Sequence, residues 1–236
     1  MKAGRTGLGT LSIMLAARML TAQPTSDVAG PLSRFAERKA ETLLREKLPC
    51  LGCHQMGNEG GRLAPDLATV RERRSAAYIA AIVADPQRVR PGTMMPRHPQ
   101  PASQEQLIVR YLATRAGTAT GGVDAPAAQR EDRSTAALYA RFCAGCHGVN
   151  GGGDGPNAKS LPVPPAIHRS AQQMSLRSDD ALFDAISGGG AIMNRSPRMP
   201  AFGLVLAPTE IRSLVRHIRE LCKCQGPAWS TDGSRR

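Results

Sequence analysis

Two copies of the motif CxxCH occur in this sequence, at 50–54 and at 143–147. In such a motif the two thiols are spaced to form thioether links to a haem, and the adjacent histidine can reach the haem iron. A thiol redox motif does not need that histidine, and no second CxxC or HxxxH unit stands at zinc-binding spacing. The motifs therefore predict two covalently bound haem c groups, attached at Cys50, Cys53, Cys143 and Cys146, with His54 and His147 on the irons.

Length and composition agree with small haem-binding domains. The chain has 236 residues, enough for two domains of about 100 residues, and one motif lies in each half. Aromatic residues make up only 3% of the chain, so side chains alone would build thin cores. A buried porphyrin would supply a large flat apolar surface for aliphatic side chains to pack against.

Residues 1–22 are typical of an export signal. Lys2 and Arg5 precede a mostly apolar run over 8–20, and Ala22 is a small residue before a possible cleavage point. Arg18 interrupts the run, so an uncleaved membrane anchor is the alternative. We expect a periplasmic protein, because haem attachment of this kind is completed outside the cytoplasm.

The two halves share one order of features, which indicates a duplication. Each has a helix leading into CxxCH, a Gly-rich segment, a middle helix, a Met-Pro pair and a final amphipathic helix. The first helix is expected over 31–48 with Phe35 on its apolar face, and Ser75 and Ser178 are expected to cap the two middle helices. Strand-like alternation is nearly absent, so the predicted fold class is all-α. The predicted domains are 31–116 and 135–224, joined by a linker at 117–134 and followed by a tail at 225–236.

Each half resembles a class I cytochrome c domain, in which the first and last helices cross beside the haem. The resemblance rests on the CxxCH motifs, the Met-Pro loops and the closing helices, and covers about 31–224. It implies two tandem domains, each a small helical bundle around its haem. It also implies that each iron is held by the motif histidine and by a methionine from a later loop.

The later loops supply the candidates for those methionines. In the first half the loop 91–96 contains two, and the Met-Pro pairing favours Met95 over Met94, with His98 as a rival. In the second half Met199 fits the distal loop, and Met193 and Met174 are weaker alternatives. The resemblance further implies that a proline carbonyl accepts the ring proton of each proximal histidine, for which Pro65 and Pro165 are the candidates.

The formal net charge is +12, and Lys2, Arg5 and Arg18 of the expected signal contribute three of these charges. In the last helix Arg212, Arg216, Arg219 and Lys223 line one face, opposite an apolar stripe. This face can steer an acidic redox protein, although a merely solvated face is the simpler interpretation. Nucleic acid is a poor candidate partner, given export and few aromatic residues for stacking.

An iron with histidine and methionine ligands has no vacant position, which favours outer-sphere electron transfer over catalysis. The leading hypothesis is a periplasmic carrier of single electrons between respiratory redox partners. One alternative is the electron-accepting cytochrome subunit of a dehydrogenase complex. The expected redox partners include a dehydrogenase or an oxidase. A dihaem enzyme, such as a thiosulfate-oxidising protein, is a weaker alternative because it needs an unusual or vacant axial site.

Cys222 and Cys224 are not explained by the resemblance. Cys222 falls near the apolar stripe of the last helix and can simply be buried. The pair can instead form a structural disulfide in an oxidising compartment, or provide a reactive thiolate, even one that replaces methionine on an iron. All three interpretations stay open at the level of the sequence.

Overall fold

The structure is a computed structural model that describes residues 31–115 and 132–230. The expected signal, most of the expected linker and the end of the expected tail lie outside these residues. From Pro31 onward the chain forms one compact unit. Residues 31–115 and residues 132–230 each have their own hydrophobic core.

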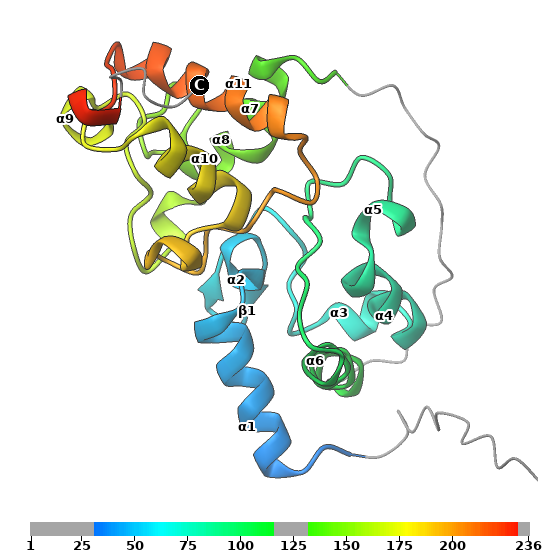
Figure 1. The fold of residues 1–236 in the computed structure, drawn as a ribbon. Helices are drawn as coiled ribbons and strands as arrows, with labels where there is room; N and C mark the ends of the chain where they lie inside the picture. Colours follow the sequence, from blue (N-terminus) through cyan, green and yellow to red (C-terminus); the bar gives the residue numbers. More distant parts are fainter. Residues whose placement is uncertain (1–30, 116–131, 231–236) are drawn as a thin grey trace, which may run out of the picture. The chain divides into compact units, whose positions relative to one another are not determined.

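The first half is built from short helices and one small hairpin (Figure 1). Its elements in chain order are α1 (Arg34–Thr42), a π-helical turn (Leu43–Lys47), α2 (Cys50–Cys53), β1 (Gln55–Met56), β2 (Glu59–Gly60), α3 (Val70–Arg73), α4 (Ala76–Ala84), α5 (Pro86–Val89) and α6 (Ala102–Thr114). The two strands pair antiparallel, with Gln55 opposite Gly60.

Local sequence explains where the helices of this half begin and end. The Ser33 hydroxyl accepts a hydrogen bond from Ala36 N, and the Ser75 hydroxyl accepts one from Tyr78 N, so both serines cap helices. Pro86 cannot continue α4 and instead opens α5. The cap expected at Ser75 is thus present.

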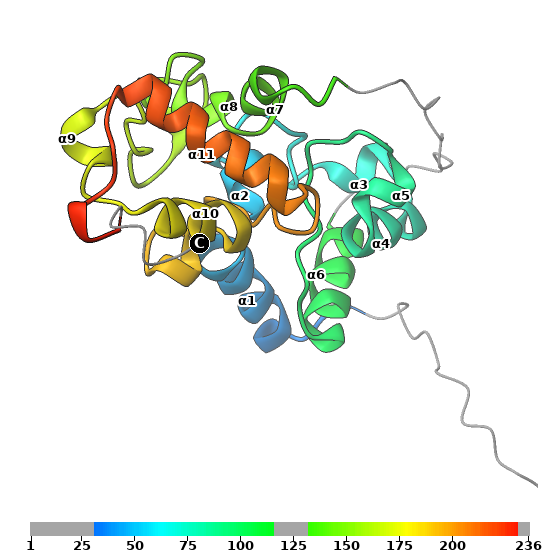
Figure 2. The same ribbon diagram turned by 45° about the horizontal axis from the view of Figure 1, so that its top comes forward.

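The core of the first half lies between α1, α4 and α6, and α6 runs beside both of the other helices (Figure 2). It also takes in the attachment motif, because Leu51 is fully buried. Its buried members are Ala40, Leu44, Leu48, Leu51, Met56, Leu67, Ile79, Ile108, Val109, Tyr111 and Leu112. Phe35, which we expected on the same face, is 71% exposed.

The second half is longer and consists of helices joined by irregular segments. Its elements are α7 (Thr135–Phe142), α8 (Ala144–His147), a 3-10 turn (Ala158–Ser160), α9 (Ala171–Met174), α10 (Asp179–Gly188), a 3-10 turn (Ala191–Met193), α11 (Pro208–Cys222) and a last 3-10 turn (Ala228–Ser230). Ser178 caps α10 by accepting a hydrogen bond from Ala181 N, as the sequence predicts.

The core of the second half lies between α7, α10 and α11, with α11 against both other helices (Figure 2). Its buried members are Leu138, Tyr139, Ala144, Met174, Leu182, Ile186, Phe202, Leu206, Ile211, Leu214, Val215, Ile218 and Cys222. The described residues are rich in helix, in agreement with an all-α class. None of their helices is long and apolar enough to cross a membrane.

Candidate haem-binding sites

In the first half the motif histidine is oriented by a backbone carbonyl. His54 follows α2, and its Nδ1 lies 2.7 Å from Pro65 O. A carbonyl oxygen can only accept, so Nδ1 carries the proton and Nε2 keeps its lone pair for a metal. Burial lowers the pKa of His54, which keeps the ring neutral. The neighbouring carbonyl is that of Pro65, the residue suggested by the resemblance.

The second motif histidine is held in the same way by a different residue. His147 Nδ1 lies 2.9 Å from the carbonyl oxygen of Ala166, not from that of Pro165. The chain from Val163 to Ile167 runs past the imidazole, and it is the carbonyl after the Pro164-Pro165 pair that faces the ring. Burial lowers the pKa of His147, so this imidazole too is neutral with a free Nε2.

A second histidine stacks on His147. The rings of His147 and His168 lie 3.9 Å apart between centroids, with an interplanar angle of 13°. His168 is only 7% exposed, and its Nδ1 lies 2.9 Å from the hydroxyl of buried Tyr139 on α7. The His147 and His168 rings are therefore stacked behind the second motif, and buried Tyr139 meets His168 edge-on and shares a hydrogen bond with it.

A cavity of about 1000 Å³ opens in front of His147. Its wall includes both thiols of the second motif, Cys143 and Cys146, and the side chain of Met199 on the opposite loop. Aliphatic and aromatic residues from α10, from the loops before and after α9, from the loop before α11 and from the chain after α11 complete the wall. Among them are Val163, Leu176, Leu182, Ile186, Phe202 and Trp229. Thiols, imidazole and thioether thus meet around one apolar space of suitable size for a porphyrin.

The loop that carries Met199 is fixed by glycine. Met199 O accepts a hydrogen bond from Gly190 N at 3.0 Å, and Met199 packs against the core of the second half. Gly189 has φ +80°, and a Cβ there would lie 2.9 Å from Met199 O. Gly189 is therefore needed both for its backbone conformation and for close approach to the loop. Of the two weaker alternatives, Met174 is fully buried in the core and lines the same cavity, as does half-buried Met193.

In the first half, the loop with the Met-Pro pair is held by Gln87 of α5. Gln87 Nε2 donates to Thr93 O at 2.8 Å and to Met95 O at 3.2 Å. Met94 contributes to the wall of the cavity beside His147, while half-buried Met95 follows it. His98 is also half-buried, and burial lowers its pKa.

Within the described residues, half-buried Arg198 at the cavity has one guanidinium nitrogen without a partner. Arg198 lines the cavity, and its Nη2 donates to Arg45 O at 2.6 Å. Among residues 31–115 and 132–230, its buried Nη1 meets no hydrogen-bond acceptor. A haem propionate would satisfy this donor, so the residues present fit the group.

The two attachment motifs lie against each other. Asn157, 1% exposed, accepts a 2.7 Å hydrogen bond from Arg62 N through Oδ1 and donates through Nδ2 to Gly52 O. The same Nδ2 lies 3.8 Å from Cys146 Sγ. Asn157 thus joins the inner glycine of the first motif to a haem-attaching thiol of the second.

The pKa values of the motif thiols reflect both their burial and the closeness of the two motifs. Burial, together with the nearby Cys146 and Cys50, raises the pKa of Cys53 to about 12. Burial likewise raises the pKa of Cys143 to about 12. All four motif cysteines are free and half-buried, so they are thiols at neutral pH, available for thioether bonds.

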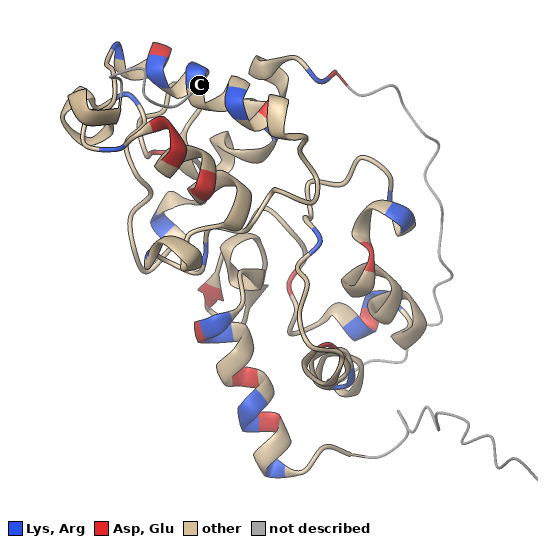
Figure 3. Cartoon of the chain, in the orientation of Figure 1, with Lys and Arg blue, Asp and Glu red and all other residues tan. Residues whose placement is uncertain are grey.

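Lys and Arg residues recur along α11 (Figure 3), but not all of those expected on its basic face are exposed. Arg212 and Arg216 are exposed, but Arg219 turns inward, with a side chain that is 13% exposed. Its Nε donates to Asp179 Oδ1 at 2.8 Å, which offsets its charge. Arg212 also packs over the Phe183 ring. An acidic protein that docks on α11 would therefore contact fewer exposed arginines than a helical projection predicts.

Comparison with known proteins now adds to this geometry. Residues 130–218 match the family described as cytochrome c oxidase, cbb3-type, subunit III. A cytochrome c family domain covers these residues. His147, the Met199 loop and most of the residues that line the cavity lie inside the matched range. Residues 31–115, which contribute Cys53 and Met94 to the wall, lie outside it.

The remaining comparisons add little. No curated protein matches the chain. Among solved structures, a chain of the Kuenenia stuttgartiensis reducing HAO-like protein complex is similar, with a TM-score of 0.31 and 16% identity. The alignment covers 81% of this chain and 97% of that one. At this TM-score the likeness carries no functional argument.

Three residues of the sites were not predicted from the sequence: Asn157, His168 and Arg198. Asn157 sits in a Gly-rich segment where a polar side chain would normally signal a turn. His168 lies in no motif, so nothing local distinguishes it from a surface histidine. Arg198 precedes the Met-Pro pair, and this position beside a ligand candidate is the one signal that could have drawn attention to it.

Proposed function

We propose that this protein is a dihaem c-type cytochrome that carries single electrons between redox proteins outside the cytoplasm. Cys50, Cys53, Cys143 and Cys146 would bind the haems covalently, His54 and Met95 would hold one iron, and His147 and Met199 the other. The single observation that carries the proposal is the cavity in which Cys143, Cys146, His147 and Met199 converge.

When bound, each haem supplies an iron that changes between its ferrous and ferric states. The residues of the chain set the conditions for that change. Pro65 O and Ala166 O orient the imidazoles and increase their basicity by accepting the Nδ1 proton. Met95 and Met199 would each supply a neutral thioether, which favours ferrous iron and would therefore raise the reduction potential. The apolar wall excludes water and acts in the same direction.

We infer that electrons pass between the haems inside one chain. The support is the contact through Asn157, which places Cys146 next to the first motif. A donor that docks at one half would then reduce both irons. The alternative, two independent haems with separate partners, needs no such buried bridge.

The experiment is to produce the protein with a haem-maturation system, denature it and measure its intact mass. The proposal predicts a mass increase of two haem groups. Cys50→Ser/Cys53→Ser should bind one haem, as should the matched variant Cys143→Ser/Cys146→Ser. A single covalent haem in the wild-type chain would contradict the proposal for the first half, and none would contradict it altogether.

A carrier should also be a competent one-electron donor on its own. The purified protein, once reduced, is expected to return to the ferric state with a soluble acceptor protein and without a bound catalytic subunit. Isolation only as a stoichiometric complex with a dehydrogenase, with no exchange to added acceptors, would instead make the chain an electron-accepting subunit.

A further inference from the structure

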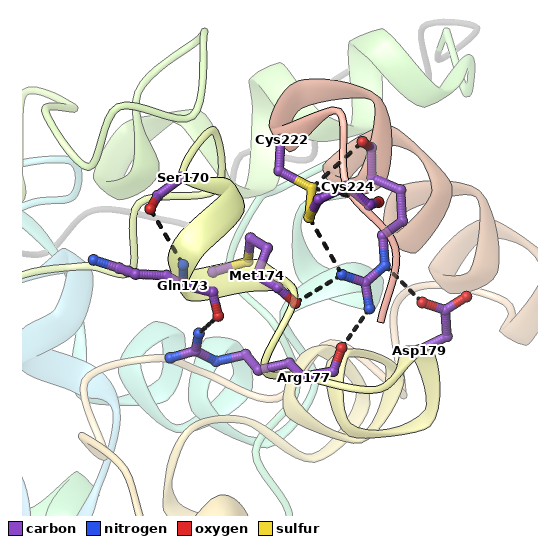
Figure 4. Close-up of a disulfide and its surroundings, with 8 residues drawn as sticks. Ser170, Gln173, Met174, Arg177, Asp179, Cys222 and Cys224 are labelled. Carbon is purple, nitrogen blue, oxygen red and sulfur yellow. Dashed lines mark hydrogen bonds and ion pairs between the residues drawn. A yellow bond between two sulfur atoms is a disulfide. The ribbon is translucent and has the colours of Figure 1, made fainter. Parts of the chain in front are cut away.

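The pair of cysteines at the end of α11 is bonded. Cys222 and Cys224 form a disulfide, with Cα atoms 5.1 Å apart (Figure 4). Lys223 between them has φ 49°, in the left-handed region, and this bend at the helix end brings the two sulfurs together. The bond closes a ring of three residues, too short to restrict an unfolded chain very much. Its location therefore calls for another explanation than global stabilisation.

The two sulfurs differ in exposure. Cys222 is 4% exposed and belongs to the core of the second half, whereas Cys224 is half-buried beyond the helix end. An external thiol can thus approach Cys224 Sγ but not Cys222 Sγ. Access of this kind decides which sulfur of a disulfide is attacked.

A cation is fixed beside the accessible sulfur. Arg219 Nη1 lies 3.8 Å from Cys224 Sγ (Figure 4). The guanidinium is held in place by Asp179 Oδ1, by Met174 O at 2.8 Å and by Arg177 O. A neighbouring guanidinium stabilises a thiolate, which makes Cys224 both a good leaving group and a reactive thiol once the bond is reduced.

The inner sulfur has an acceptor for the proton it would gain. Cys222 Sγ lies 3.4 Å from Arg219 O and 3.7 Å from Cys224 O. A protonated Cys222 thiol can donate to either oxygen, so the reduced pair is accommodated without a new buried unsatisfied group. After reduction, the surroundings of Cys224 stabilise its thiolate form and those of Cys222 stabilise its thiol form.

We propose that Cys222 and Cys224 are a thiol–disulfide exchange site whose reaction partner is an external thiol. A thiolate attacks Cys224 Sγ, the S–S bond breaks, and its electron pair leaves on Cys222 Sγ, which takes up a proton. A second thiolate then attacks the external sulfur of the mixed disulfide. It forms the external disulfide and releases the Cys224 thiolate beside Arg219. Two external thiols are oxidised to one disulfide, and the protein pair gains the two electrons.

The test uses the full-length holoprotein, kept anaerobic in buffers of reduced and oxidised glutathione. Free thiols are trapped by alkylation and located by peptide mass. The proposal predicts that the 222–224 pair changes between oxidised and reduced forms reversibly as the glutathione ratio changes. In Cys222→Ser a glutathione adduct should form on Cys224, and in Cys224→Ser Cys222 should remain unmodified. A pair that stays oxidised at the most reducing ratio would overturn the proposal.

Arg219 is tested through the rate at which Cys224 reacts in the Cys222→Ser background. Adding Arg219→Gln should slow alkylation at neutral pH roughly tenfold, the equivalent of about one pKa unit. Arg216→Gln, an exposed arginine of the same helix, is the matched control and should leave the rate unchanged. Equal rates in both variants would remove Arg219 from the site. The peptide map also counts alkylated cysteines in the CxxCH motifs, so failure of haem attachment is seen separately.

Discussion

At the scale of single residues, the proposed haem site beside His147 includes a polar contact that involves neither His147 nor Met199. The Tyr139 hydroxyl meets His168 Nδ1, and His168 stacks on His147. Both Tyr139 and His168 are nearly fully buried, so neither group can exchange this partner for water. A stacked ring also restricts the rotation of the proximal imidazole. Loss of this contact should therefore destabilise the second half.

Tyr139→Phe should lower the free energy of unfolding by about 1–3 kcal/mol, because it leaves a buried imidazole nitrogen unsatisfied. Chemical denaturation of the holoprotein measures the loss. The matched control is Tyr78→Phe on α4, outside the second half, which should change stability by less than about 0.5 kcal/mol. An unchanged midpoint for Tyr139→Phe would show that water or another group serves His168.

A second residue-scale prediction concerns Glu41. The Tyr111 hydroxyl donates to Glu41 Oε1 at 2.6 Å, and this hydrogen bond, with Arg115 adding to it, lowers the pKa of Glu41. A lowered pKa in the folded state stabilises the protein above the pKa of the unfolded chain, and that stability is lost as pH falls through the folded value. Tyr111→Phe should therefore raise the Glu41 pKa toward its ordinary value. Carboxyl titration by NMR on the ferrous protein tests this; no rise would contradict the assigned cause.

At the scale of elements, the sequence predicted where helices begin better than it predicted which side chains of α1 are buried. Ser75 and Ser178 cap their helices because a serine before an apolar run has a local preference for that role. Phe35 was wrongly placed on the buried face of α1. It lies five residues before Ala40, about 140° around the helix, so it points away from the core that buries Ala40 and Leu44.

The residues of the candidate sites likewise divide into those in local motifs and those brought together by the fold. The motif cysteines and histidines stand at fixed local spacing, so the sequence alone is enough to propose them as haem-binding residues. Contacts that arise only when distant segments meet could not, which is why Ala166 O takes the place given to Pro165 O. Arg219 shows the same limit, since its partners come from α10, from the end of α9 and from the chain between these helices.

The stripe of α11 allows a direct test at this scale. Leu214 is fully buried between the helices of the second half, and Arg216 is exposed two residues later. Leu214→Ala should reduce the free energy of unfolding by about 2–5 kcal/mol, through lost apolar burial and a residual cavity. Arg216→Ala should stay within about 0.5 kcal/mol of the wild type. Similar losses for both variants, measured by denaturant titration, would mean that α11 does not pack as described.

At the scale of the whole described molecule, the two attachment motifs share a buried junction. Asn157 accepts a hydrogen bond from Arg62 N and donates one to Gly52 O, and a Cβ on Gly145 would meet the Leu63 side chain. The junction makes the halves mechanically dependent on each other. It also shortens the route by which an electron would pass between them.

Asn157→Ala should leave the buried Gly52 carbonyl without its partner and cost about 1–3 kcal/mol of unfolding free energy. It should also slow electron exchange between the haems, observed as slower equilibration after one haem is photoreduced. Asn150→Ala, exposed in the same Gly-rich segment, is the control and should change neither quantity. Exchange at the wild-type rate in Asn157→Ala would remove the junction from the electron route.

In the proposed cytochrome, two irons are each held by one histidine and one methionine. The iron–methionine charge-transfer absorption of the oxidised holoprotein, quantified per chain, measures this directly. We predict two equivalents in the wild type, one in Met95→Ala and one in Met199→Ala, each loss accompanied by a lower potential for one haem. A wild-type spectrum of two bis-histidine haems, or of a cysteine-ligated haem, would contradict the account.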